Sequence, residues 1–451
     1  MGGVLVLGAG MISRPMVSYL LDHTKYPVVV ASRTISKVRR ILGGHPRGEA
    51  KEVDATKADA LEPLVRDAEL VVSLLPYVYH PMVARICLKH GKHLVTTSYV
   101  SPAMRALDPD FKSAGLISLN EIGLDPGIDH MSAMRVIDSV KREGGEIVAF
   151  SSYCGALPAP EAALNPFGYK FSWSPRGVLL ASRNAARFLK DGKVVDIPGN
   201  ELFENYTFKE VPGVGWFEEY PNRDSIPYLD TYGIRSARTM YRATLRNIGW
   251  CETMRKIAEL GLLDDTERGG LENLTWAGLM AEKLGCGSGD IKSALARRLR
   301  VPVGSTVIKR LEWLGLLADE RLPAEKSVLD ALTALMLRKL SYGDRERDMV
   351  VLHHEFVARM GDGATRYLTS TLVDFGVPGG DTAVARTVSY PAAIAVRLIL
   401  EGKITARGVQ VPVIPEIYEP VLKELEGLGI KTVERSGASG MEFRDESNRT
   451  K

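Results

Sequence analysis

A short apolar segment followed by a glycine-rich turn begins this chain and constrains its fold more than any other feature. Residues Val4–Leu7 have the composition of a buried strand, and Gly8–Ser13 (Gly-Ala-Gly-Met-Ile-Ser) follows directly. In a strand, turn and helix of this kind, Gly8 permits the tight turn and Gly10 lets a phosphate approach the backbone at the helix N-terminus. The pattern predicts a dinucleotide-binding turn. The alternative is a glycine-rich turn that serves packing only.

The end of the second predicted strand indicates which dinucleotide the turn would hold. Residues Val28–Ala31 form another apolar run, and Ser32-Arg33-Thr34 follows it. A site for NAD places a carboxylate here, where it accepts hydrogen bonds from the ribose hydroxyls. In this chain a guanidinium flanked by two hydroxyls takes that place, which suits the extra phosphate of NADP. We therefore predict NADP as the cofactor. The alternative for Arg33 is a surface arginine without a special role.

Length and composition exclude several classes of protein. A chain of 451 residues is too long for one compact core, so two or three domains are expected. The net charge of +3 is nearly balanced over this length and gives no argument for a nucleic-acid partner. No apolar run approaches the ~20 residues that span a bilayer, and a strand that begins at Val4 leaves no room for a leader peptide. We expect no membrane partner.

The spacing of cysteine and histidine argues against disulfides and against a bound metal. The four cysteines form no C-x-x-C pair, which is typical of a reduced, cytoplasmic protein. His353 and His354 are neighbours on a predicted strand, so their side chains point to opposite faces and do not share an ion. No metal site is predicted.

Apolar strands alternate with helices over the first 128 residues, which predicts an α/β, doubly wound parallel sheet. Further strands are expected at residues 50–54, 70–75, 93–97 and 116–119, and helices at 11–21, 36–42, 82–90 and 102–114. Ligands of such sheets collect at the carboxyl ends of the strands. These ends define the predicted cofactor site: Gly8, Ala9, Gly10, Met11, Ile12, Ser32, Arg33, Thr34, Asp54, Ser73, Leu74, Thr97, Ser98, Tyr99, Leu124 and Asp125.

Beyond residue 128 the pattern changes twice. Residues 129–250 and 343–384 are predicted to form an α+β domain, with a Pro- and aromatic-rich run at 157–176 that suits a binding wall or a subunit contact. Residues 251–342 repeat Leu/Ala-rich segments of helical period and predict a helical insertion whose Leu/Trp stripes form a core. Residues 385–435, with the apolar helix Ala383–Leu400, are expected to pack on the first domain, and 436–451 to form a frayed tail.

Eight motifs, of which the first contains the glycine turn, are together far more specific than that turn alone. They are Gly8–Pro15, Leu74–Tyr77, Thr97–Met104, Asn120–His130, Ser152–Glu161, Gly168–Pro175, Tyr220–Ser225 and Thr244–Arg246. Together they resemble the saccharopine dehydrogenase (saccharopine reductase) family of the lysine α-aminoadipate pathway along essentially the whole chain. A small departure is Ala156, where glycine is more usual in the family.

This resemblance implies a reaction and an architecture. The reaction is saccharopine + NADP⁺ + water ⇌ L-glutamate + L-2-aminoadipate 6-semialdehyde + NADPH, in lysine biosynthesis. The architecture is a Rossmann domain, a mixed α+β substrate and dimerisation domain with a helical insertion, and a homodimer. Ser32-Arg33-Thr34 resembles the NADP-dependent branch of the family, because the NAD-dependent branch has an acid there.

The substrate has three carboxylates, which call for arginine and for hydrogen-bonding anchors. Within the family motifs we expect Arg223 and Arg246 as the leading anchors and Lys170 as the third. The predicted substrate site is completed by Ser98, Tyr99, Asp125, Phe171, Thr244 and Leu245. Asp125 and Tyr99 are the predicted catalytic residues, holding the amine or relaying its proton. Two alternatives are open: Asp125 is the N-cap of a helix that starts near Ile128, or the substrate's own amine acts through a water.

Two other functions compete with this prediction. A relative could reduce another imine, as carboxynorspermidine- or homospermidine-type enzymes do, but a polyamine substrate would call for acids where Lys170, Arg223 and Arg246 stand. A non-catalytic NADP-binding regulator would have lost the motifs that form the substrate site, yet these motifs are intact at residues 169–174 and 222–225.

Overall fold

The computed structural model describes residues 2–437, which group into two compact units. The first unit comprises Met1–Ser152, Tyr228–Ala237 and Leu352–Lys451, and the second comprises Tyr153–Pro227 and Arg238–Val351. The three-domain division expected from the sequence stays a prediction.

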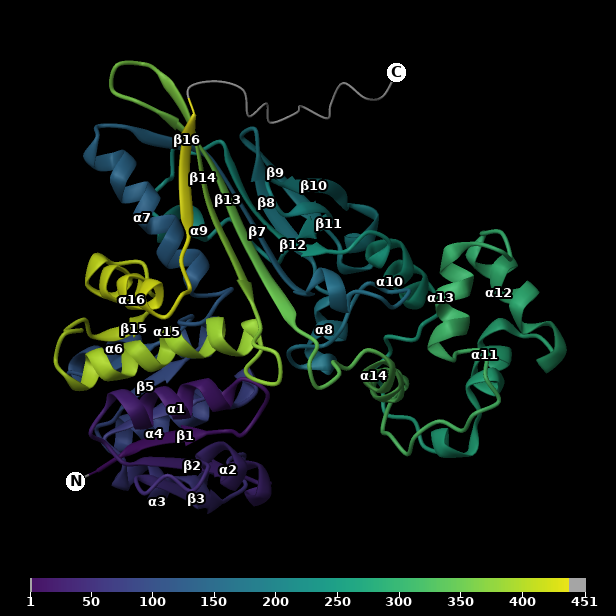
Figure 1. The fold of residues 1–451 in the computed structure, drawn as a ribbon, viewed down its shortest axis with the longest axis horizontal. Coiled ribbons are helices and arrows are strands. Elements are labelled where there is room, and N and C mark those ends of the chain that lie inside the picture. Colours follow the sequence, from purple (N-terminus) through teal and green to yellow (C-terminus); the bar gives the residue numbers. More distant parts are fainter. Residues whose placement is uncertain (1, 438–451) are drawn as a thin grey trace. The chain divides into compact units, whose positions relative to one another are not determined.

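A seven-stranded parallel sheet forms the centre of the first unit (Figure 1). Its order is β15-β6-β5-β4-β1-β2-β3, which confirms the predicted doubly wound arrangement. The buried strands β1 and β4 pair in register along their whole length, from Val4 with Leu70 to Leu7 with Ser73. The strands are β1 (Val4–Leu7), β2 (Val28–Ser32), β3 (Gly48–Glu52), β4 (Leu70–Ser73), β5 (His93–Thr96), β6 (Ile117–Leu119) and β15 (Gly408–Gln410).

Several strand and helix boundaries differ from the prediction by one or two residues, and one predicted helix is divided. β3 lies two residues earlier than expected, and β4 ends at Ser73 rather than at residue 75. The helix predicted at 102–114 is two helices, because Pro109 lacks the N–H that a continuous helix would need and instead occupies the first turn of the second one. The helices of this part are α1 (Ser13–His23), α2 (Ile35–Leu42), α3 (Ala58–Asp67), η1 (Tyr77–Tyr79), α4 (His80–Lys89), α5 (Pro102–Arg105), α6 (Asp108–Ser113) and α7 (Ile128–Arg142).

The C-terminal helices belong to the same unit as the parallel sheet. Helix α15 (Ala383–Leu400) lies beside α1 in Figure 1, and the Ser389 hydroxyl donates a hydrogen bond to the Ile12 carbonyl at the start of α1. By length and composition α15 is apolar enough to cross a membrane, whereas the sequence analysis had found no such segment. In the structure 72% of this helix is buried, as expected of a core helix. Two further helices complete this unit: α9 (Tyr228–Thr231) and α16 (Pro415–Gly427).

A second sheet of nine strands contains the remaining strands. β13 and β14 are neighbours in this sheet, and β14 pairs antiparallel with β16 from Tyr367 with Gly437 to Thr371 with Val433. Residues 436 and 437 therefore belong to a strand, where a frayed tail was predicted, and the rest of that tail lies outside the described residues. The strands are β7 (Glu146–Pro158), β8 (Ala186–Lys190), β9 (Lys193–Ile197), β10 (Thr207–Val211), β11 (Gly215–Pro221), β12 (Thr239–Arg246), β13 (Asp348–Arg359), β14 (Thr365–Phe375) and β16 (Val433–Gly437).

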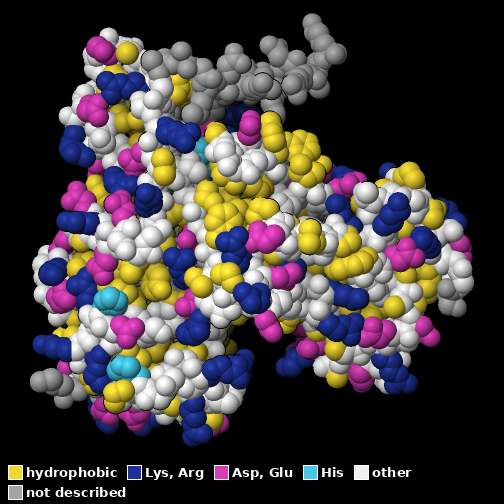
Figure 2. Space-filling view, in the orientation of Figure 1, with side chains coloured by type: hydrophobic (Ala, Val, Ile, Leu, Met, Phe, Trp, Pro, Cys, Tyr) yellow, Lys and Arg dark blue, Asp and Glu magenta, His cyan; other side chains and the backbone are white. Residues whose placement is uncertain are grey.

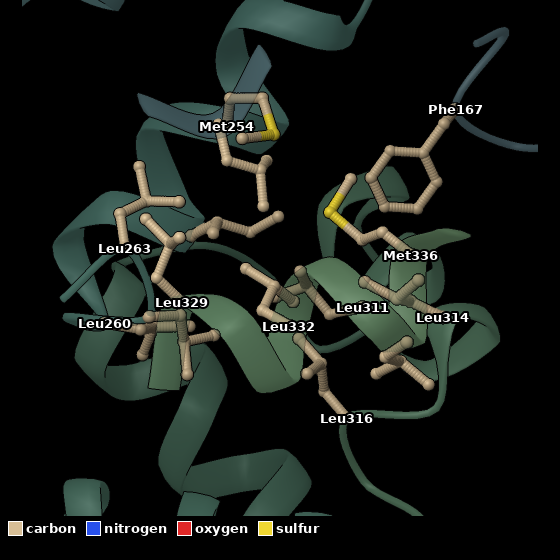
Figure 3. Close-up of a cluster of buried hydrophobic side chains, with 14 of the residues drawn as sticks. Phe167, Met254, Leu260, Leu263, Leu311, Leu314, Leu316, Leu329, Leu332 and Met336 are labelled. Carbon is tan, nitrogen blue, oxygen red and sulfur yellow. The ribbon is translucent and has the colours of Figure 1, made fainter. Parts of the chain in front are cut away.

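The second unit contains the predicted helical insertion and its core. Figure 3 shows Leu311, Leu332 and Met336 from this insertion, and all three are fully buried. The same cluster includes Trp250 and Phe171, so the aromatic run and the insertion share one hydrophobic core. The helices are η2 (Pro160–Ala162), α8 (Pro175–Ala181), η3 (Gly199–Glu204), α10 (Trp250–Glu259), η4 (Leu271–Asn273), α11 (Trp276–Leu284), η5 (Ser288–Asp290), α12 (Ile291–Leu299), α13 (Thr306–Leu314) and α14 (Val328–Lys339).

Candidate functional site

The glycine-rich turn after β1 is shaped for close approach by a ligand. Gly8 has φ of +111°, and a Cβ there would lie 3.3 Å from the Leu74 carbonyl oxygen. A Cβ at Gly10 would meet nothing within 4 Å, so the backbone is open at this point. Ser13, fully buried, accepts a hydrogen bond from Gly10 N (2.9 Å) and donates one to Gly8 O (3.2 Å). The serine hydroxyl thus closes the turn and leaves Gly10 accessible.

The end of β2 presents an exposed arginine between two hydroxyl residues. Arg33 and Thr34 are exposed, and the Ser32 hydroxyl lies 3.5 Å from the backbone nitrogen of Thr34. The nearby carboxylate of Asp54, after β3, accepts hydrogen bonds from the Thr56 hydroxyl (2.6 Å) and backbone N–H (3.2 Å). These bonds, with smaller contributions from Lys57 and Arg33, lower the pKa of Asp54. The accessible guanidinium and its hydroxyl neighbours fit the ribose phosphate of NADP.

A buried histidine that the sequence analysis missed joins the ends of two strands, β4 and β5. His80, at the start of α4, is 2% exposed. Its Nδ1 lies 3.0 Å from the Ser73 hydroxyl, and its Nε2 lies 2.9 Å from the Ser98 hydroxyl and 3.0 Å from that of Thr96. Burial lowers the pKa of His80 to about 4, so the ring is neutral at physiological pH. Ser73 is fully buried, and its hydroxyl faces His80.

The two predicted catalytic residues are brought together in the first unit. The Tyr99 hydroxyl donates a hydrogen bond of 2.6 Å to the Asp125 carboxylate. The N-cap alternative for Asp125 is wrong: α7 begins at Ile128 after Gly127, and Asp129 supplies the carboxylate that accepts from Gly127 N (2.5 Å). The N-cap is Gly127, and Asp129 in the first turn binds its backbone N–H.

A buried acid and a histidine hold the loop that carries Tyr99. Glu121 is 5% exposed and has φ of +56°, an uncommon conformation for a residue other than glycine. Its backbone N–H donates to Ser98 O (3.1 Å), and its carboxylate accepts from Val100 N (2.9 Å) and lies 2.8 Å from His130 Nε2. The His130 Nδ1 in turn lies 2.6 Å from the Tyr232 hydroxyl. Both sides of Tyr99 are therefore fixed by one residue.

The second unit contains a buried arginine on β12. Arg246 is 4% exposed, and its guanidinium lies 5.2 Å from the Tyr169 ring and 5.7 Å from the Trp250 ring. Its Nη1 donates to the Leu245 carbonyl at 2.9 Å, whereas Nε has no hydrogen-bond partner within the described part of the chain. The Trp250 indole N–H is also buried without a partner there. A buried guanidinium with an unused donor is suited to binding a carboxylate.

Strand alternation sorts the neighbouring predicted residues by face. Thr244 and Arg246 point to the same face of β12, whereas Leu245 points to the other and is buried in a separate apolar cluster. Phe171 is likewise packed in the core. The Lys170 ammonium forms an ion pair with Glu346 and lies 5.8 Å from the Tyr342 ring. Its charge is therefore already balanced, which makes it a weaker anchor than Arg246.

Arg223 lies in an exposed loop with a constrained backbone. Its φ is +57°, and its carbonyl accepts a hydrogen bond of 2.9 Å from Arg187 N at the edge of β8. The predicted pair of arginine anchors thus consists of one exposed and one buried side chain. Alternation along β12 places Arg246 with Arg242 and Thr244 on a polar face, so the sequence pattern did not indicate its burial. Nothing in the Tyr-Pro-Asn-Arg motif indicates the backbone conformation of Arg223.

Histidine and cysteine side chains have other roles. Among the described residues, no group of three or more His, Cys, Asp or Glu residues is arranged to hold a metal ion. His353 Nδ1 lies 2.8 Å from the Thr371 hydroxyl, and His354 Nε2 lies 2.9 Å from the Ser132 hydroxyl. The four cysteines are free.

Comparison with known proteins agrees with the class that this fold defines, an α/β dinucleotide-binding oxidoreductase. Residues 4–119 match the model of the saccharopine dehydrogenase NADP binding domain, and residues 123–430 match that of the saccharopine dehydrogenase C-terminal domain. The chain belongs to the saccharopine dehydrogenase family.

Relatives from fungi match nearly the whole chain. Saccharopine dehydrogenase (NADP⁺, L-glutamate-forming) of Saccharomyces cerevisiae is 40% identical over 94% of this chain and 96% of its own length. The Pyricularia oryzae protein of the same name is 40% identical over 96% and 98%. A solved structure, apo histidine-tagged saccharopine dehydrogenase (L-Glu forming) from Saccharomyces cerevisiae, is similar with a TM-score of 0.87 and 38% identity, covering 97% of this chain and 100% of that one.

The neutral histidine of the first unit predicts a loss of stability in acid. The unfolded chain binds a proton at His80 below pH ~6.5, whereas the folded protein does so only near pH 4. The contribution of His80 to the free energy of unfolding is therefore fully present above pH ~6.5. It falls by up to about 3 kcal/mol as the pH drops to 4. Denaturant titrations at several pH values should show a smaller decline for His80→Gln than for the unchanged protein. Parallel declines for the two proteins would contradict this prediction.

Proposed function

We propose that this protein is an NADP-dependent saccharopine dehydrogenase that forms L-glutamate. It interconverts saccharopine, NADP⁺ and water with L-glutamate, L-2-aminoadipate 6-semialdehyde and NADPH, in lysine biosynthesis. The observation that carries this proposal is Arg246, a buried guanidinium beside two aromatic rings, with an unused Nε donor. A substrate with three carboxylates supplies the anion that such a group needs, and the fungal relatives bear this activity in their names.

The cofactor binds along the strand ends of the parallel sheet in this proposal. The open backbone at Gly10 accepts the pyrophosphate, and Arg33 binds the ribose phosphate. When bound, NADP⁺ accepts a hydride from the substrate carbon next to the secondary amine. The other residues assigned to the cofactor are Gly8, Ala9, Met11, Ile12, Ser32, Thr34, Asp54, Ser73, Leu74, Thr97, Ser98, Tyr99, Leu124 and Asp125.

The carbon that is oxidised follows from the products. The aldehyde oxygen is found on the terminal carbon of the aminoadipate chain, while the nitrogen leaves with glutamate. Hydride therefore leaves that terminal carbon, the C–N bond becomes an imine, and water adds to the same carbon before the C–N bond breaks. Each turnover in this direction releases one proton net, so the site must accept protons from the amine and from the attacking water.

Asp125 and Tyr99 are the residues proposed to handle these protons. The Asp125 carboxylate accepts a hydrogen bond of 2.6 Å from Tyr99, which fixes its orientation. An ionised carboxylate accepts several hydrogen bonds at once, so it suits a substrate ammonium. Glu121, held by His130, fixes the loop on both sides of Tyr99. We assign Asp125 as the group that holds the secondary amine and Tyr99 as its orienting partner. A bound water that relays the proton from the amine is the alternative.

Substrate carboxylates bind to Arg246 and Arg223 in this proposal, with hydroxyl donors at Ser98 and Thr244. Lys170, paired with Glu346, contributes less. Tyr99, Asp125, Phe171 and Leu245 complete the assigned substrate residues, of which Phe171 and Leu245 act through the backbone because their side chains are buried. A polyamine-type imine would leave the charge of Arg246 without a counterpart.

The cofactor assignment predicts a switch at one residue. With L-glutamate and the semialdehyde as substrates, nicotinamide absorbance should show strong preference for NADPH over NADH. Arg33→Asp should lower kcat/KM for NADPH by about 100-fold or more, because a carboxylate repels the ribose phosphate, and should leave that for NADH equal or higher. Arg39→Asp, on the exposed surface of the following helix α2, serves as the control.

Preference for NADH would overturn the role of Arg33. Tight NADPH binding without turnover would favour another imine or a non-catalytic regulator.

The substrate assignment predicts a selective loss at Arg246. Arg246→Gln should raise KM for saccharopine by about 30-fold or more, since it removes a charge-assisted bidentate contact. The Kd for NADPH, measured by fluorescence titration, should change less than about threefold and thereby report an intact fold. The control is Arg338→Gln, whose guanidinium is half exposed and paired with Glu320 in the same unit. An unchanged KM in Arg246→Gln would contradict the proposed carboxylate site.

We also propose a cytoplasmic homodimer. The free cysteines support a reducing compartment. Charged side chains of both signs are interspersed over the face in Figure 2. In the second unit Phe208 and Trp216 are each about half exposed on the paired strands β10 and β11, and Val194 on β9 is also about half exposed. Such apolar exposure favours burial by a second copy. Light scattering after size-exclusion chromatography should give a dimer that Trp216→Arg weakens. A monomer of the unchanged protein at micromolar concentration would refute the dimer.

A further inference from the structure

A buried histidine, whose side-chain partners in the described part of the chain are all hydroxyl groups, contacts Ser98, one of the residues assigned to the substrate. His80 contacts Ser73 through Nδ1 and both Ser98 and Thr96 through Nε2, at 2.9–3.0 Å. Its pKa is lowered by burial, and no charged neighbour contributes to that shift. Among these three hydroxyl residues, Ser73 and Thr96 are fully buried, whereas Ser98 is partly exposed. Ser98 is therefore the point at which this buried network reaches the surface.

The hydrogen atoms of this network must be shared in one of two ways. A neutral imidazole carries one N–H and one bare nitrogen. If Nε2 is bare, Thr96 and Ser98 compete to donate a hydrogen to it, and a Ser98 hydroxyl that donates to His80 has none to offer a ligand. If Nε2 carries the hydrogen, it donates to the Ser98 oxygen, and Ser73 donates to the bare Nδ1. The hydrogen of Ser98 is then directed away from His80.

The backbone limits what Thr96 can do in this network. Its hydroxyl oxygen accepts a hydrogen bond of 3.3 Å from the backbone N–H of Ser98, which holds Thr96 and Ser98 in a fixed relation. The two hydroxyls therefore share Nε2 as a pair. A carboxylate is an acceptor only, so it needs Ser98 as a donor.

We propose that His80 is a positioning residue that, as the Nε2–H tautomer, orients the Ser98 hydroxyl to donate a hydrogen bond to a substrate carboxylate. This inference rests on the proposed function, since it assumes a substrate with carboxylates at Ser98. It also gives Ser73 a role different from contact with the cofactor: Ser73 selects the tautomer by donating to Nδ1.

Amide substitutions distinguish positioning from packing. In His80→Gln the side-chain amide reaches the place of Nε2 and still donates to Ser98, whereas in His80→Asn it reaches only the place of Nδ1. His80→Asn should raise KM for saccharopine about tenfold, the effect of one hydrogen bond, with little change in the Kd for NADPH. His80→Gln should remain within about threefold of the unchanged protein. His93→Gln is the control, because His93 lies at the opposite end of β5.

A double-mutant cycle tests whether His80 acts through Ser98. Ser98→Ala should raise KM by a similar factor, and adding His80→Asn to it should cost no more than about a further twofold. Ser73→Ala is a smaller change that serves if His80→Asn does not fold. Alone it should raise KM for saccharopine about threefold, and in the Ser98→Ala background it should have no further effect.

The outcomes separate this inference from the proposed function. Independent, multiplying effects of His80 (or Ser73) and Ser98 would overturn the positioning role while saccharopine turnover stands. Equal losses in His80→Gln and His80→Asn, or equal losses in His93→Gln, would do the same by indicating a packing effect. Absence of saccharopine turnover in the unchanged protein, with NADPH still bound, would overturn the proposed function and this inference together.

Discussion

Parallel pairing of β1 with its neighbours β2 and β4 is the constraint on which the first unit depends. Because the strands run in one direction, their carboxyl ends coincide at one edge of the sheet. The turn at Gly8, the exposed Arg33 and the buried Ser73 are brought to that edge only by this register. A shift of one residue would turn the apolar side chains of these strands to the wrong faces, so the core fixes the site.

Behind this edge, buried polar groups hold the accessible ones. His80 joins Ser73, Thr96 and Ser98, and Glu121 fixes the loop on both sides of Tyr99. Each of these buried groups has identified partners, as low-dielectric surroundings require. Arg246 in the second unit differs from these groups: its Nε is buried without a partner in the described part of the chain, and its surroundings are aromatic. This buried donor without a partner is the physical reason to assign an anionic ligand to Arg246.

The sequence predicted the features that depend on local pattern. Apolar runs identified the strands of the parallel sheet, and helical periodicity identified the insertion. The three-residue strand β15 was missed because it is too short for periodicity and pairs with β6 from almost 300 residues away. Asp125 could not be separated from a helix cap until Asp129 was seen to supply the carboxylate of that turn. The division of proton roles between Asp125 and Tyr99 remains a proposal.

Long-range networks were beyond prediction for a different reason. His80 stands alone in a Tyr-His-Pro segment with no motif around it, and its partners are 7, 16 and 18 residues away. Only the three-dimensional meeting of β4, β5 and α4 brings them together. Likewise, no pattern in the sequence indicates that Glu121 adopts a left-handed conformation, because the need arises from contacts with Ser98 and Val100.

Isotope transfer tests the central claim most directly. The protein would be supplied with L-glutamate, L-2-aminoadipate 6-semialdehyde and NADPH carrying deuterium at both positions of nicotinamide C4, and the product analysed by tandem mass spectrometry. The account predicts saccharopine with one deuterium on the terminal carbon of its aminoadipate half. Deuterium on the α-carbon of the glutamate half, or NADPH that stays unconsumed with no saccharopine formed, would contradict it.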